Sequence, residues 1–400
     1  MSKRILFVMN TLGRAGAETA LMELLGRLET SCEIDLYVLM GQGELVSKLP
    51  PGVRLLNKSF SDCSVFSAKG RFRMAGTVIK AMLNRATVVR LIPYLCRNIW
   101  AMLKKGRVQT DKLLWRVLSD GGMRISREYD LAVAFLEGGA AYYVADHVKA
   151  RKKAAFIHID YEQAGYTRSL DRDCYLQFDA LFPIAEEIRD KLLMVYPECA
   201  DRTQVFHNLI NREVILEKSV QGEGFTDGYT GTRILTVGRL NSQKSYPVAI
   251  RAMKLLKDAG CRARWYVLGE GEERRALEHR IAEYGLEEDF VLAGAVENPF
   301  PYYRQADLYV HATRYEGKSI AIQEAQILGC AIIASDCTGN REQIIHGSDG
   351  ILCKLSPEAV RDAILELLAD EPLRGRLRQA AACKQVTYEE DIELLTGLLK

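Results

Sequence analysis

The sequence predicts an α/β protein made of two domains, each with a parallel sheet that helices cover on both faces. Three observations support this prediction. The chain has 400 residues, which is more than a single hydrophobic core usually organises. Short apolar runs alternate with amphipathic helical stretches, the pattern of a parallel sheet with crossover helices. The alternation stops at residues 221–232, a segment rich in glycine and threonine, and then starts again.

Apolar runs predict the strands of the first half at residues 5–9, 34–39, 131–136, 154–158, 180–184 and 204–206. Between the first two runs, leucines at positions 21, 24, 25 and 28 repeat at helical spacing, so we expect a helix packed on the sheet. In the second half, strands are expected at 234–237, 265–268, 290–292, 308–311 and 331–334. Helices are expected there at 247–259, 273–284, 320–328 and 357–368.

These elements place the domains at residues 1–220 and 221–385. The C-terminal residues 386–400 are expected to form one more helix, because Ile392, Leu395 and Leu399 share a helical register.

Composition and charge exclude several classes of protein. The hydrophobic fraction of 48% and the charged fraction of 26% are those of a globular protein, and the net charge of +2 gives no reason to expect a nucleic-acid partner. The ten cysteines form no CxxC pair and no cluster with zinc-ligand spacing. The apolar run near the N-terminus fits a first strand rather than a signal peptide, and no run is long enough to span a bilayer. We therefore expect a cytoplasmic protein with reduced cysteines.

Residues 61–127 interrupt the alternation and predict a helical insertion in the first domain. The segment holds fourteen lysine and arginine residues against three aspartates, a net charge of +11. Aromatic and aliphatic residues are interleaved with these charges. One interpretation is an inserted pair of helices with a solvated basic face. The interpretation that we favour is a surface that meets anionic lipid head groups, with Trp100 and Trp115 at the boundary.

Two glutamates mark a predicted strand-to-helix junction in the second half. Glu316 lies in the loop and Glu324 in the first turns of the helix. Backbone N–H groups of residues 317–320 are expected to be unpaired at this helix start and to suit an anion. Carboxylates beside such a place can accept hydrogen bonds from sugar or ribose hydroxyls. The alternative is that Glu316 is a helix N-terminal charge and Glu324 a solvated helix residue.

The segment VGRLNSQK, at residues 237–244, directly follows a predicted strand. Arg239 and Lys244 can converge on a diphosphate, the arginine as a bidentate fork and the lysine as a point charge. The alternative is that both are surface charges. A third segment, GEGEER at residues 269–274, has the glycines of a tight turn, but its acidic residues argue against a phosphate cradle.

Together with ADLYVHATRYEGKSIAIQEAQILGCAIIASDCTGNREQI at residues 306–344, these segments resemble the GT4 glycosyltransferases, which are retaining enzymes with the GT-B fold. The resemblance covers residues 230–355 strongly and the first half more loosely. It implies two Rossmann-like domains that face each other across a cleft, with the nucleotide-sugar in the C-terminal domain and the last helix crossing back to the first domain. Lys318 and Ser319 stand where Phe-Gly is commoner, a variant of capsule and exopolysaccharide enzymes.

The resemblance also implies roles for individual residues. Arg239 and Lys244, next to Gly238, bind the donor diphosphate and stabilise the leaving nucleotide. Glu316 binds hydroxyls of the transferred sugar, and Glu324 holds the ribose hydroxyls. The remaining donor contacts come from the backbone of Gly317, Lys318, Ser319 and Ile320.

In the first half the resemblance rests on shorter motifs. Gly16 corresponds to a glycine-rich turn near the donor or acceptor, although Ala15 replaces the usual first glycine. His158 ends a predicted strand, and the resemblance gives it a catalytic role near the reacting centre; the alternative is a structural histidine. Asn208 is expected to shape a hinge. Asp171 and Asp173 form a D-x-D motif, but it lacks the context of a metal-dependent glycosyltransferase, and we expect no metal and no cofactor.

The implied function is transfer of a hexose or amino sugar, with retention of configuration, from a nucleotide-diphosphate sugar, with UDP the commoner base. The expected acceptor is a lipid-linked glycan in surface polysaccharide synthesis, and the expected location is the inner face of the plasma membrane. Two alternatives remain: a soluble GT-B enzyme acting on a small molecule, a glucan or a protein, and a catalytically silent scaffold. An epimerase of the same fold is a further outsider. The sequence makes no prediction about oligomeric state.

Overall fold

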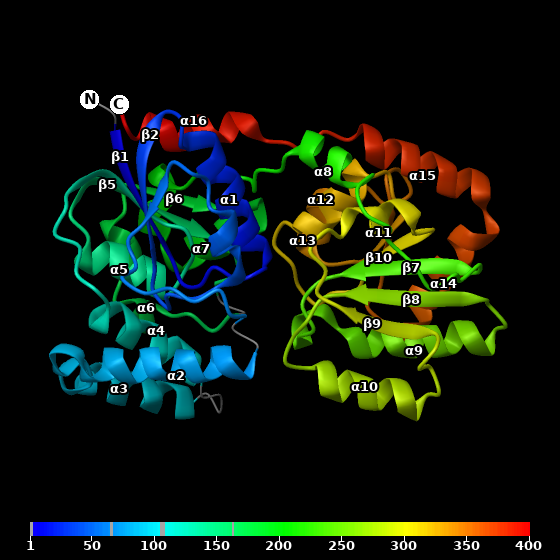
Figure 1. Cartoon of the computed structure of the whole chain (residues 1–400), viewed down its shortest axis with the longest axis horizontal. Coiled ribbons are helices and arrows are strands. Elements are labelled where there is room, and N and C mark those ends of the chain that lie inside the picture. Colours follow the sequence, from blue (N-terminus) through cyan, green and yellow to red (C-terminus); the bar gives the residue numbers. More distant parts are fainter. Residues whose placement is uncertain (1–2, 65–66, 105–108, 162–163) are drawn as a thin grey trace. The chain divides into compact units, whose positions relative to one another are not determined.

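A computed structural model describes residues 3–64, 67–104, 109–161 and 164–400 (Figure 1). The chain divides into two compact units, of which the first is Met1–Leu209 with Tyr388–Lys400 and the second is Ile210–Thr387. The boundary lies before helix α8 (Arg212–Lys218) rather than after residue 220, because α8 packs on α11 (Phe300–Gln305) and α12 (Ile320–Ile327) of the second unit.

The C-terminal segment belongs to the first unit and ends in α16 (Ile392–Gly397). A carboxylate oxygen of Asp391 accepts a hydrogen bond of 2.7 Å from the backbone N–H of His207 and lies 2.8 Å from the His207 ring. Arg27 and Glu389 add an ion pair of 2.8 Å. These contacts hold the end of the chain against the first unit.

The first unit is built on a six-stranded parallel sheet in the order β3-β2-β1-β4-β5-β6. The strands are β1 (Lys3–Met9), β2 (Cys32–Val38), β3 (Val53–Leu55), β4 (Tyr129–Ala134), β5 (Ala150–Ile157) and β6 (Ala180–Pro183). Strand β1 is central, paired with β2 and β4, and residues 5–9 are fully buried. This burial on both faces explains why the strand is a continuous apolar run.

Two details of the first sheet differ from the sequence prediction. Strand β3 has only three residues and was not predicted. Residues 204–206 form no strand, although the backbone N–H groups of Gln204 and Phe206 still donate to carbonyls of Leu181 and Pro183, at 3.0 and 2.9 Å. Besides the insertion described next, the α-helices that follow these strands are α1 (Gly16–Leu28), α5 (Gly139–His147), the single turn α6 (Arg168–Asp171) and α7 (Glu186–Val195).

In its described residues, the predicted helical insertion contains three α-helices rather than a pair, namely α2 (Ala68–Leu83), α3 (Thr87–Lys104) and α4 (Thr110–Gly121). Helix α4 packs against α5 and also contacts α2 and α3, so it lies between the outer pair and the rest of the unit (Figure 1). No helix in the described ranges is both long and apolar enough to cross a membrane.

The structure corrects the expectation for Trp115 and for the charge of α4. Trp115 is half-buried and packs against the hydrophobic clusters on both sides of α4. Arg116 is fully buried, where it ion-pairs with Asp146 and donates to the backbone oxygen of Asp171 at 2.9 Å. Helix α4 therefore presents neither residue to a boundary with lipid. Lys105 and Arg107 lie outside the described residues.

The second unit repeats the architecture with a six-stranded parallel sheet in the order β12-β11-β10-β7-β8-β9. Its strands are β7 (Thr232–Val237), β8 (Ala263–Leu268), β9 (Phe290–Gly294), β10 (Leu308–His311), β11 (Ile332–Ser335) and β12 (Ile351–Cys353), and only β12 was not predicted. Besides α8, α11 and α12, the helices are α9 (Tyr246–Asp258), α10 (Arg274–Glu283), α13 (Thr338–Gln343), α14 (Pro357–Ala369) and α15 (Glu371–Cys383). The α/β fold predicted for this half is therefore confirmed.

Candidate active site

The carboxyl ends of β7 and β10 form the centre of the candidate site in the second unit. Within the sheet, β8 and β9 follow β7 towards one edge. The chain then crosses over to β10, which pairs with the opposite edge of β7. Open α/β sheets bind ligands at such a switch point, beyond the carboxyl ends of the strands. The loop after β7 carries Lys244 and the loop after β10 carries Glu316, so the topology brings together two residues that are 72 positions apart.

Lys244, His311 and Glu316 form a polar cluster with little exposure to solvent. Lys244 Nζ donates to Oε2 of Glu316. The Nε2 atom of His311 lies 3.2 Å from Lys244 Nζ and 3.1 Å from the same carboxylate oxygen. The Lys244 and Glu316 side chains are each 14% exposed, and His311 is 1% exposed. The cluster is thus an ion pair between Lys244 and Glu316 whose carboxylate also contacts the buried imidazole of His311.

Electrostatics fix the protonation states of this cluster. Burial opposes ionisation of Glu316, but the charge of Lys244 and the hydrogen bond from His311 outweigh it and lower the pKa of Glu316 to about 2. Burial lowers the pKa of His311, and the Lys244 charge lowers it further against the opposing effect of Glu316. At neutral pH we therefore assign an ionised Glu316 and a neutral His311. With its proton on Nε2, His311 donates to Glu316 and can accept at Nδ1 from the Tyr309 hydroxyl, 3.1 Å away.

Arg239 lies just beyond the end of β7 and is exposed. Among the described residues, no carboxylate lies within ion-pair distance of its guanidinium, which contrasts with the paired Lys244. An arginine without a counter-charge at the carboxyl edge of a sheet can take a phosphate through two parallel N–H donors.

Glycines let the neighbouring loops pack tightly under Arg239 and Lys244. A Cβ atom on Gly269, where φ is +155°, would lie 2.0 Å from the carbonyl oxygen of Gly238, and one on Gly271 would lie 2.2 Å from that of Leu240. At Gly238 itself, a Cβ would lie 3.4 Å from the Lys244 side chain. The glycines of residues 269–274 therefore serve backbone packing against the loop after β7.

Helix α13 holds the loop that carries Glu316 through hydrogen bonds between Gln343 and Ser319. The Gln343 side chain accepts a hydrogen bond of 2.7 Å from the backbone N–H of Ser319 and donates one of 2.9 Å to its carbonyl. Gln326 in turn donates to the Gln343 backbone at 2.7 Å. The Ser319 amide was expected to be unpaired and open to a ligand, and this is wrong for the structure described, because Gln343 occupies it. Gly317, Lys318 and Ile320 lie beside it at the start of α12.

Gly339→Ala should reduce turnover of the donor sugar by about tenfold to a hundredfold, because reacting groups tolerate little displacement. A methyl group at Gly339 would lie 2.1 Å from the carbonyl oxygen of Gly317 and 2.2 Å from that of Glu316, so the loop must move. Steady-state kinetics measure the effect. Gly375→Ala is the matched control, since nothing lies within 4 Å of that position. Equal turnover by both variants would contradict the positioning role of α13.

Glu324 lies on α12, half-buried, and its Oε2 accepts a hydrogen bond of 2.9 Å from the Tyr303 hydroxyl. Burial raises the pKa of Glu324 to about 7, although the Tyr303 hydrogen bond acts in the opposite direction. The carboxyl group is therefore neither a solvated surface charge nor a member of the Lys244 cluster. Its protonation changes close to physiological pH.

In the first unit, His158 follows β5 and Glu137 follows β4, its neighbour in the sheet. A Glu137 carboxylate oxygen accepts a hydrogen bond of 3.0 Å from the backbone N–H of His158. Asn10, just beyond β1, donates to the Glu137 backbone at 3.2 Å and accepts from the N–H of Ala140 at 2.8 Å. These side chains gather at the β1–β4 switch point of the first sheet.

His158 itself is buried between aromatic rings, with Phe135 at 5.2 Å and Phe156 at 6.2 Å between ring centroids. Burial lowers its pKa to about 4, so the imidazole is neutral at physiological pH. Its Nε2 atom has no hydrogen-bond partner among the described residues. Gly16, the other candidate of this half, is exposed at the first residue of α1.

The two carboxylates of the D-x-D motif have separate partners. Buried Asp171 accepts hydrogen bonds from the hydroxyls of Tyr142 at 2.6 Å and of Tyr161. Asp173 forms an ion pair of 2.6 Å with Arg168 instead. Asp171 is therefore part of the internal packing of the first unit, whereas Asp173 forms an ion pair near the surface.

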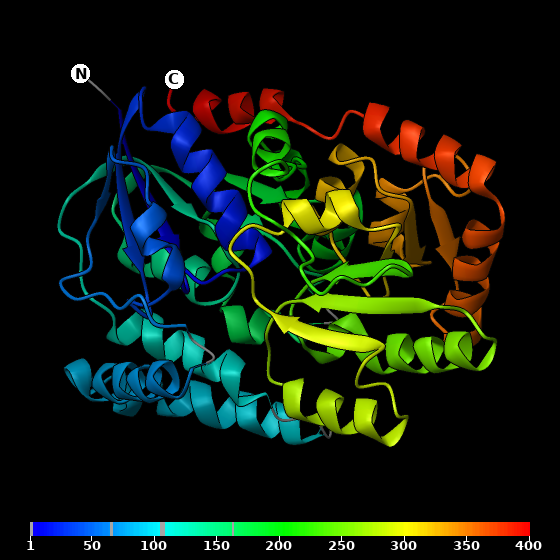
Figure 2. The same cartoon turned by 45° about the vertical axis from the view of Figure 1, so that its right-hand side comes forward.

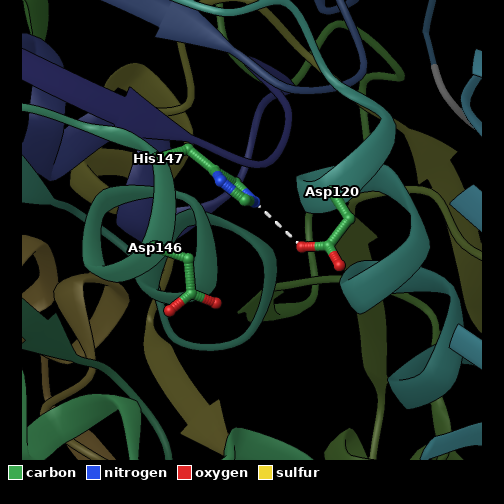
Figure 3. Close-up of side chains that lie close together, drawn as sticks. All are labelled: Asp120, Asp146 and His147. Carbon is green, nitrogen blue, oxygen red and sulfur yellow. Dashed lines mark hydrogen bonds and ion pairs between the residues drawn. The ribbon is translucent and has the colours of Figure 1, made fainter. Parts of the chain in front are cut away.

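Asp120, Asp146 and His147 bring three potential ligand atoms within 4.8 Å of one another (Figure 3). His147 Nε2 lies 2.9 Å from an Asp120 oxygen, and Asp146 ion-pairs with the buried Arg116. Burial works against the ionisation of Asp120, yet the His147 hydrogen bond and the Arg116 charge lower its pKa. The arginine already supplies the positive charge of this cluster.

Sequence reasoning selected Lys244 and Glu316 but missed the residues that hold them. His311 is the last residue of the predicted strand 308–311 but was not singled out, although a polar residue at a strand's carboxyl end is the signal that singled out His158. Gln343 and Gly339 gave no local signal, because their partners lie more than twenty positions away in sequence. Glu137 was overlooked, although it directly precedes the glycine pair at 138–139.

Comparison with known proteins identifies the second unit. Residues 229–383 match the family model described as glycosyl transferases group 1. The match spans β7 to α15 and includes Arg239, Lys244, Glu316 and Glu324. The second unit therefore belongs to this family, and the family expected from the sequence is confirmed.

Curated relatives include glycosyltransferases of bacterial polysaccharide and glycan synthesis. The N-acetylgalactosamine-N,N'-diacetylbacillosaminyl-diphospho-undecaprenol 4-alpha-N-acetylgalactosaminyltransferase of Campylobacter jejuni is 26% identical over 218 residues, which is 54% of this chain and 58% of that protein. The amylovoran biosynthesis glycosyltransferase AmsD of Erwinia amylovora is 29% identical over 162 residues, 40% of this chain and 46% of that protein. The chain spans about half the length of the curated relatives that it matches.

Solved structures show the same fold over the whole chain. Anabaena Alr3699/HepE in complex with UDP-glucose has a TM-score of 0.69 at 14% identity and covers 99% of this chain and 100% of its own. Sucrose-phosphate synthase from Thermosynechococcus elongatus has a TM-score of 0.68 at 16% identity and covers 99% and 98%. At this identity the likeness establishes the fold, which is GT-B as expected.

Proposed function

We propose that this protein is a retaining glycosyltransferase that moves a hexose or amino sugar from a UDP-sugar to a lipid-linked glycan. The Lys244–His311–Glu316 cluster carries the proposal, because it lies at the switch point of a sheet whose residues match the group 1 family. Arg239, exposed and unpaired among the described residues, stands beside the same strand end. The preference for UDP is supported by the UDP and UDP-glucose complexes of Anabaena HepE.

The donor would be held by charge and by carboxylates without a metal ion. Arg239 and Lys244 supply two positive charges for the diphosphate, and the Glu316 carboxylate accepts hydrogen bonds from hydroxyls of the sugar. Glu324 accepts hydrogen bonds from ribose hydroxyls through the carboxylate that Tyr303 orients. Fixed charges that need no rearrangement at the moment of reaction are an effective way to stabilise a leaving diphosphate.

The transfer step needs no nucleophilic carboxylate. The bond between the anomeric carbon and the diphosphate oxygen breaks, and the acceptor hydroxyl forms its bond to that carbon on the same face. The acceptor proton passes to the departing phosphate oxygen, so charge and atoms balance. Arg239 and Lys244 stabilise the negative charge that grows on the diphosphate, and Glu316 orients the sugar.

The acceptor is inferred from chemistry and relatives together. The Campylobacter jejuni relative carries a diphospho-undecaprenol acceptor in its name, and the Erwinia amylovora relative acts in amylovoran biosynthesis. A lipid-linked acceptor brings the enzyme to a membrane, and the basic helices of the first unit suit the anionic inner face of the plasma membrane. We therefore place the enzyme there as a peripheral protein.

The acceptor class can be tested with purified protein, radiolabelled UDP-sugars and polyprenyl-diphosphate glycans. We expect label in the organic phase, which holds the lipid product, with the anomeric configuration of the donor retained. Label transferred equally well to water-soluble glycans or small molecules would support the soluble alternative. Donor binding without transfer to any acceptor would favour a silent scaffold.

Affinity for a UDP-sugar should fall about tenfold between pH 8 and pH 6, because only ionised Glu324 accepts two hydroxyl hydrogen bonds and its pKa is raised to about 7. Binding weakens as the pH falls, because the raised pKa leaves Glu324 mostly protonated below pH 7. Isothermal calorimetry of the nucleotide-sugar gives the profile. In Glu324→Gln the profile should become flat, and an unchanged slope in that variant would remove Glu324 from the donor site.

A further inference from the structure

The outer faces of α2 and α3 carry a concentration of apolar side chains that no described residue of the chain covers. The described residues expose fourteen large hydrophobic side chains, and eight of them lie on these two helices. They are Phe72, Ile79, Leu83, Val89, Ile92, Ile99, Trp100 and Leu103. Phe72 is 84% exposed, Leu83 77% and Trp100 60%. Single exposed hydrophobic residues are ordinary, but a group of this kind marks an interaction surface.

Helix α3 shows the pattern most clearly, because it has two stripes on opposite sides. Residues 87, 91, 94, 98 and 102 are buried towards α4 and the rest of the unit. Residues 89, 92, 96, 99 and 103 repeat at the same helical spacing and are exposed. A helix that packs only on its own domain needs one stripe. The second stripe indicates a second apolar environment outside the protein.

Helix α2 repeats this arrangement beside it. Phe72, Ile79 and Leu83 recur at helical spacing on its exposed side, whereas Gly70 and Ala81 are buried on the other. Both helices contact each other and pack on α4 (Figures 1 and 2). Their exposed stripes therefore lie on the side away from α4, and we call the two stripes together the α2–α3 surface.

The charge around the α2–α3 surface is of one sign. Residues 68–104 contain eight lysine and arginine residues and no aspartate or glutamate. On α3, the exposed residues Arg90, Arg97 and Lys104 are seven positions apart and form a row along one edge of the apolar stripe. Lys69, Arg73 and Lys80 occupy the equivalent edge of α2 by the same spacing rule. The Lys104 ammonium lies 3.6 Å above the ring of Trp100.

We propose that the α2–α3 surface docks this protein on an anionic lipid bilayer, with the apolar stripes in the boundary between head groups and acyl chains. The basic rows then meet lipid phosphates, while Trp100 and Lys104 lie at the interface that suits an amphipathic ring and a flexible cation. A second copy of the same surface would set one basic row against another, which argues against self-association. The proposal excludes α4, whose Trp115 and Arg116 face inwards.

The inference rests on the proposed function only for its setting, a lipid-linked acceptor. Its test needs neither donor nor acceptor, so failure of docking and failure of the glycosyltransferase assignment can be told apart. A protein that binds vesicles but transfers no sugar would refute only the glycosyltransferase assignment. An active enzyme that does not bind vesicles would refute only the docking surface.

The first test is sedimentation of the full chain with vesicles of phosphatidylcholine, with and without phosphatidylglycerol. We expect binding only to the anionic vesicles, weakened by salt. Changing Arg90, Arg97, Lys104 and Lys80 to Gln should weaken binding about a thousandfold. The control changes the exposed residues Arg275, Arg280 and Arg376 of the second unit to Gln and should bind normally. Equal loss in both variants, or none in either, would overturn the proposal.

The second test reports insertion rather than attraction. Trp100 is one of three tryptophans, and the other two are half-buried Trp115 and fully buried Trp265. Lipids brominated near the head group should quench the fluorescence of the native protein, and Trp100→Phe should abolish that quenching while keeping most of the binding. Phe72→Ser with Leu103→Ser should reduce binding, whereas the control pair Met194→Ser and Ile345→Ser should not. Vesicle binding without quenching of Trp100 would refute docking through this surface. Far-ultraviolet circular dichroism and thermal unfolding verify the fold of each variant.

Discussion

Glu316→Gln should lower the rate of sugar transfer by about 10²- to 10³-fold, the usual cost of removing one preorganised group that stabilises the transition state. The carboxylate is held ionised, with a pKa lowered to about 2, so the native group offers charged acceptors to the hydroxyls of the sugar. The amide keeps the shape but loses the charge. Steady-state kinetics and single-turnover transfer measure the loss.

The same variant should not lose affinity for UDP. Glu316 is the counter-charge of Lys244, and removing it leaves the ammonium free for the diphosphate. A lower transfer rate with equal or tighter UDP binding therefore separates a role at the sugar from general damage. Glu272→Gln, on an exposed residue of the same unit, is the matched control. Near-normal turnover in Glu316→Gln would remove this residue from the site.

Lys244→Ala should weaken binding of UDP by about tenfold to a hundredfold, as expected for loss of a charge-assisted hydrogen bond to a phosphate. The lysine is already oriented in the absence of ligand by its ion pair with Glu316. Calorimetric titration with UDP gives the value. Arg239→Ala should cause a similar loss of affinity without lowering thermal stability, since that side chain has no ion-pair partner among the described residues.

A double variant distinguishes two ways in which Lys244 can act. If its ammonium binds the diphosphate directly, Lys244→Ala with Glu316→Gln should bind UDP as weakly as Lys244→Ala alone. If Lys244 only neutralises Glu316, the second change should restore native affinity. Restored affinity would count against the diphosphate role, and so would unchanged affinity in Lys244→Ala.

The strands of both sheets were predictable because parallel strands buried on both faces are continuous apolar runs. Residues 5–9 are fully buried, and the run in the sequence is correspondingly unbroken. The two missed strands, β3 and β12, are edge strands of three residues, too short for a periodic signal. Helix bounds in the second unit agree within one residue for α9 and α12.

The candidate site was predictable only in part. Residue types and spacing singled out Lys244 and Glu316, but their contact depends on the crossover from β9 that places β10 beside β7, which a local pattern does not contain. The Ser319 amide looked open to a ligand because helix starts leave unpaired N–H groups. Gln343, from another helix, satisfies it. Partners that come from distant segments are set by tertiary packing.

In the basic insertion too, tertiary packing decides which side chains are buried, and the local sequence does not. Helices α3 and α4 have similar compositions, with tryptophan, leucine and arginine in each, yet one faces outwards and the other inwards. Asp146 and the backbone of Asp171 receive the buried Arg116 of α4. Helix α3 itself contains no acidic residue, and its second stripe stays exposed. The sequence indicated a segment rich in basic and apolar residues, and the fold shows that those exposed to solvent lie mainly on α2 and α3.

The most direct test of the donor site is a thermal-shift titration of the purified protein with UDP-, GDP- and ADP-sugars, with and without EDTA. We predict that a UDP-sugar alone stabilises the protein, by about 2.7 kcal/mol at a hundred times its dissociation constant. EDTA should leave the shift unchanged, because Arg239 and Lys244 supply the positive charge. Stabilisation by none of the nucleotide-sugars, or a shift that EDTA abolishes, would contradict the account.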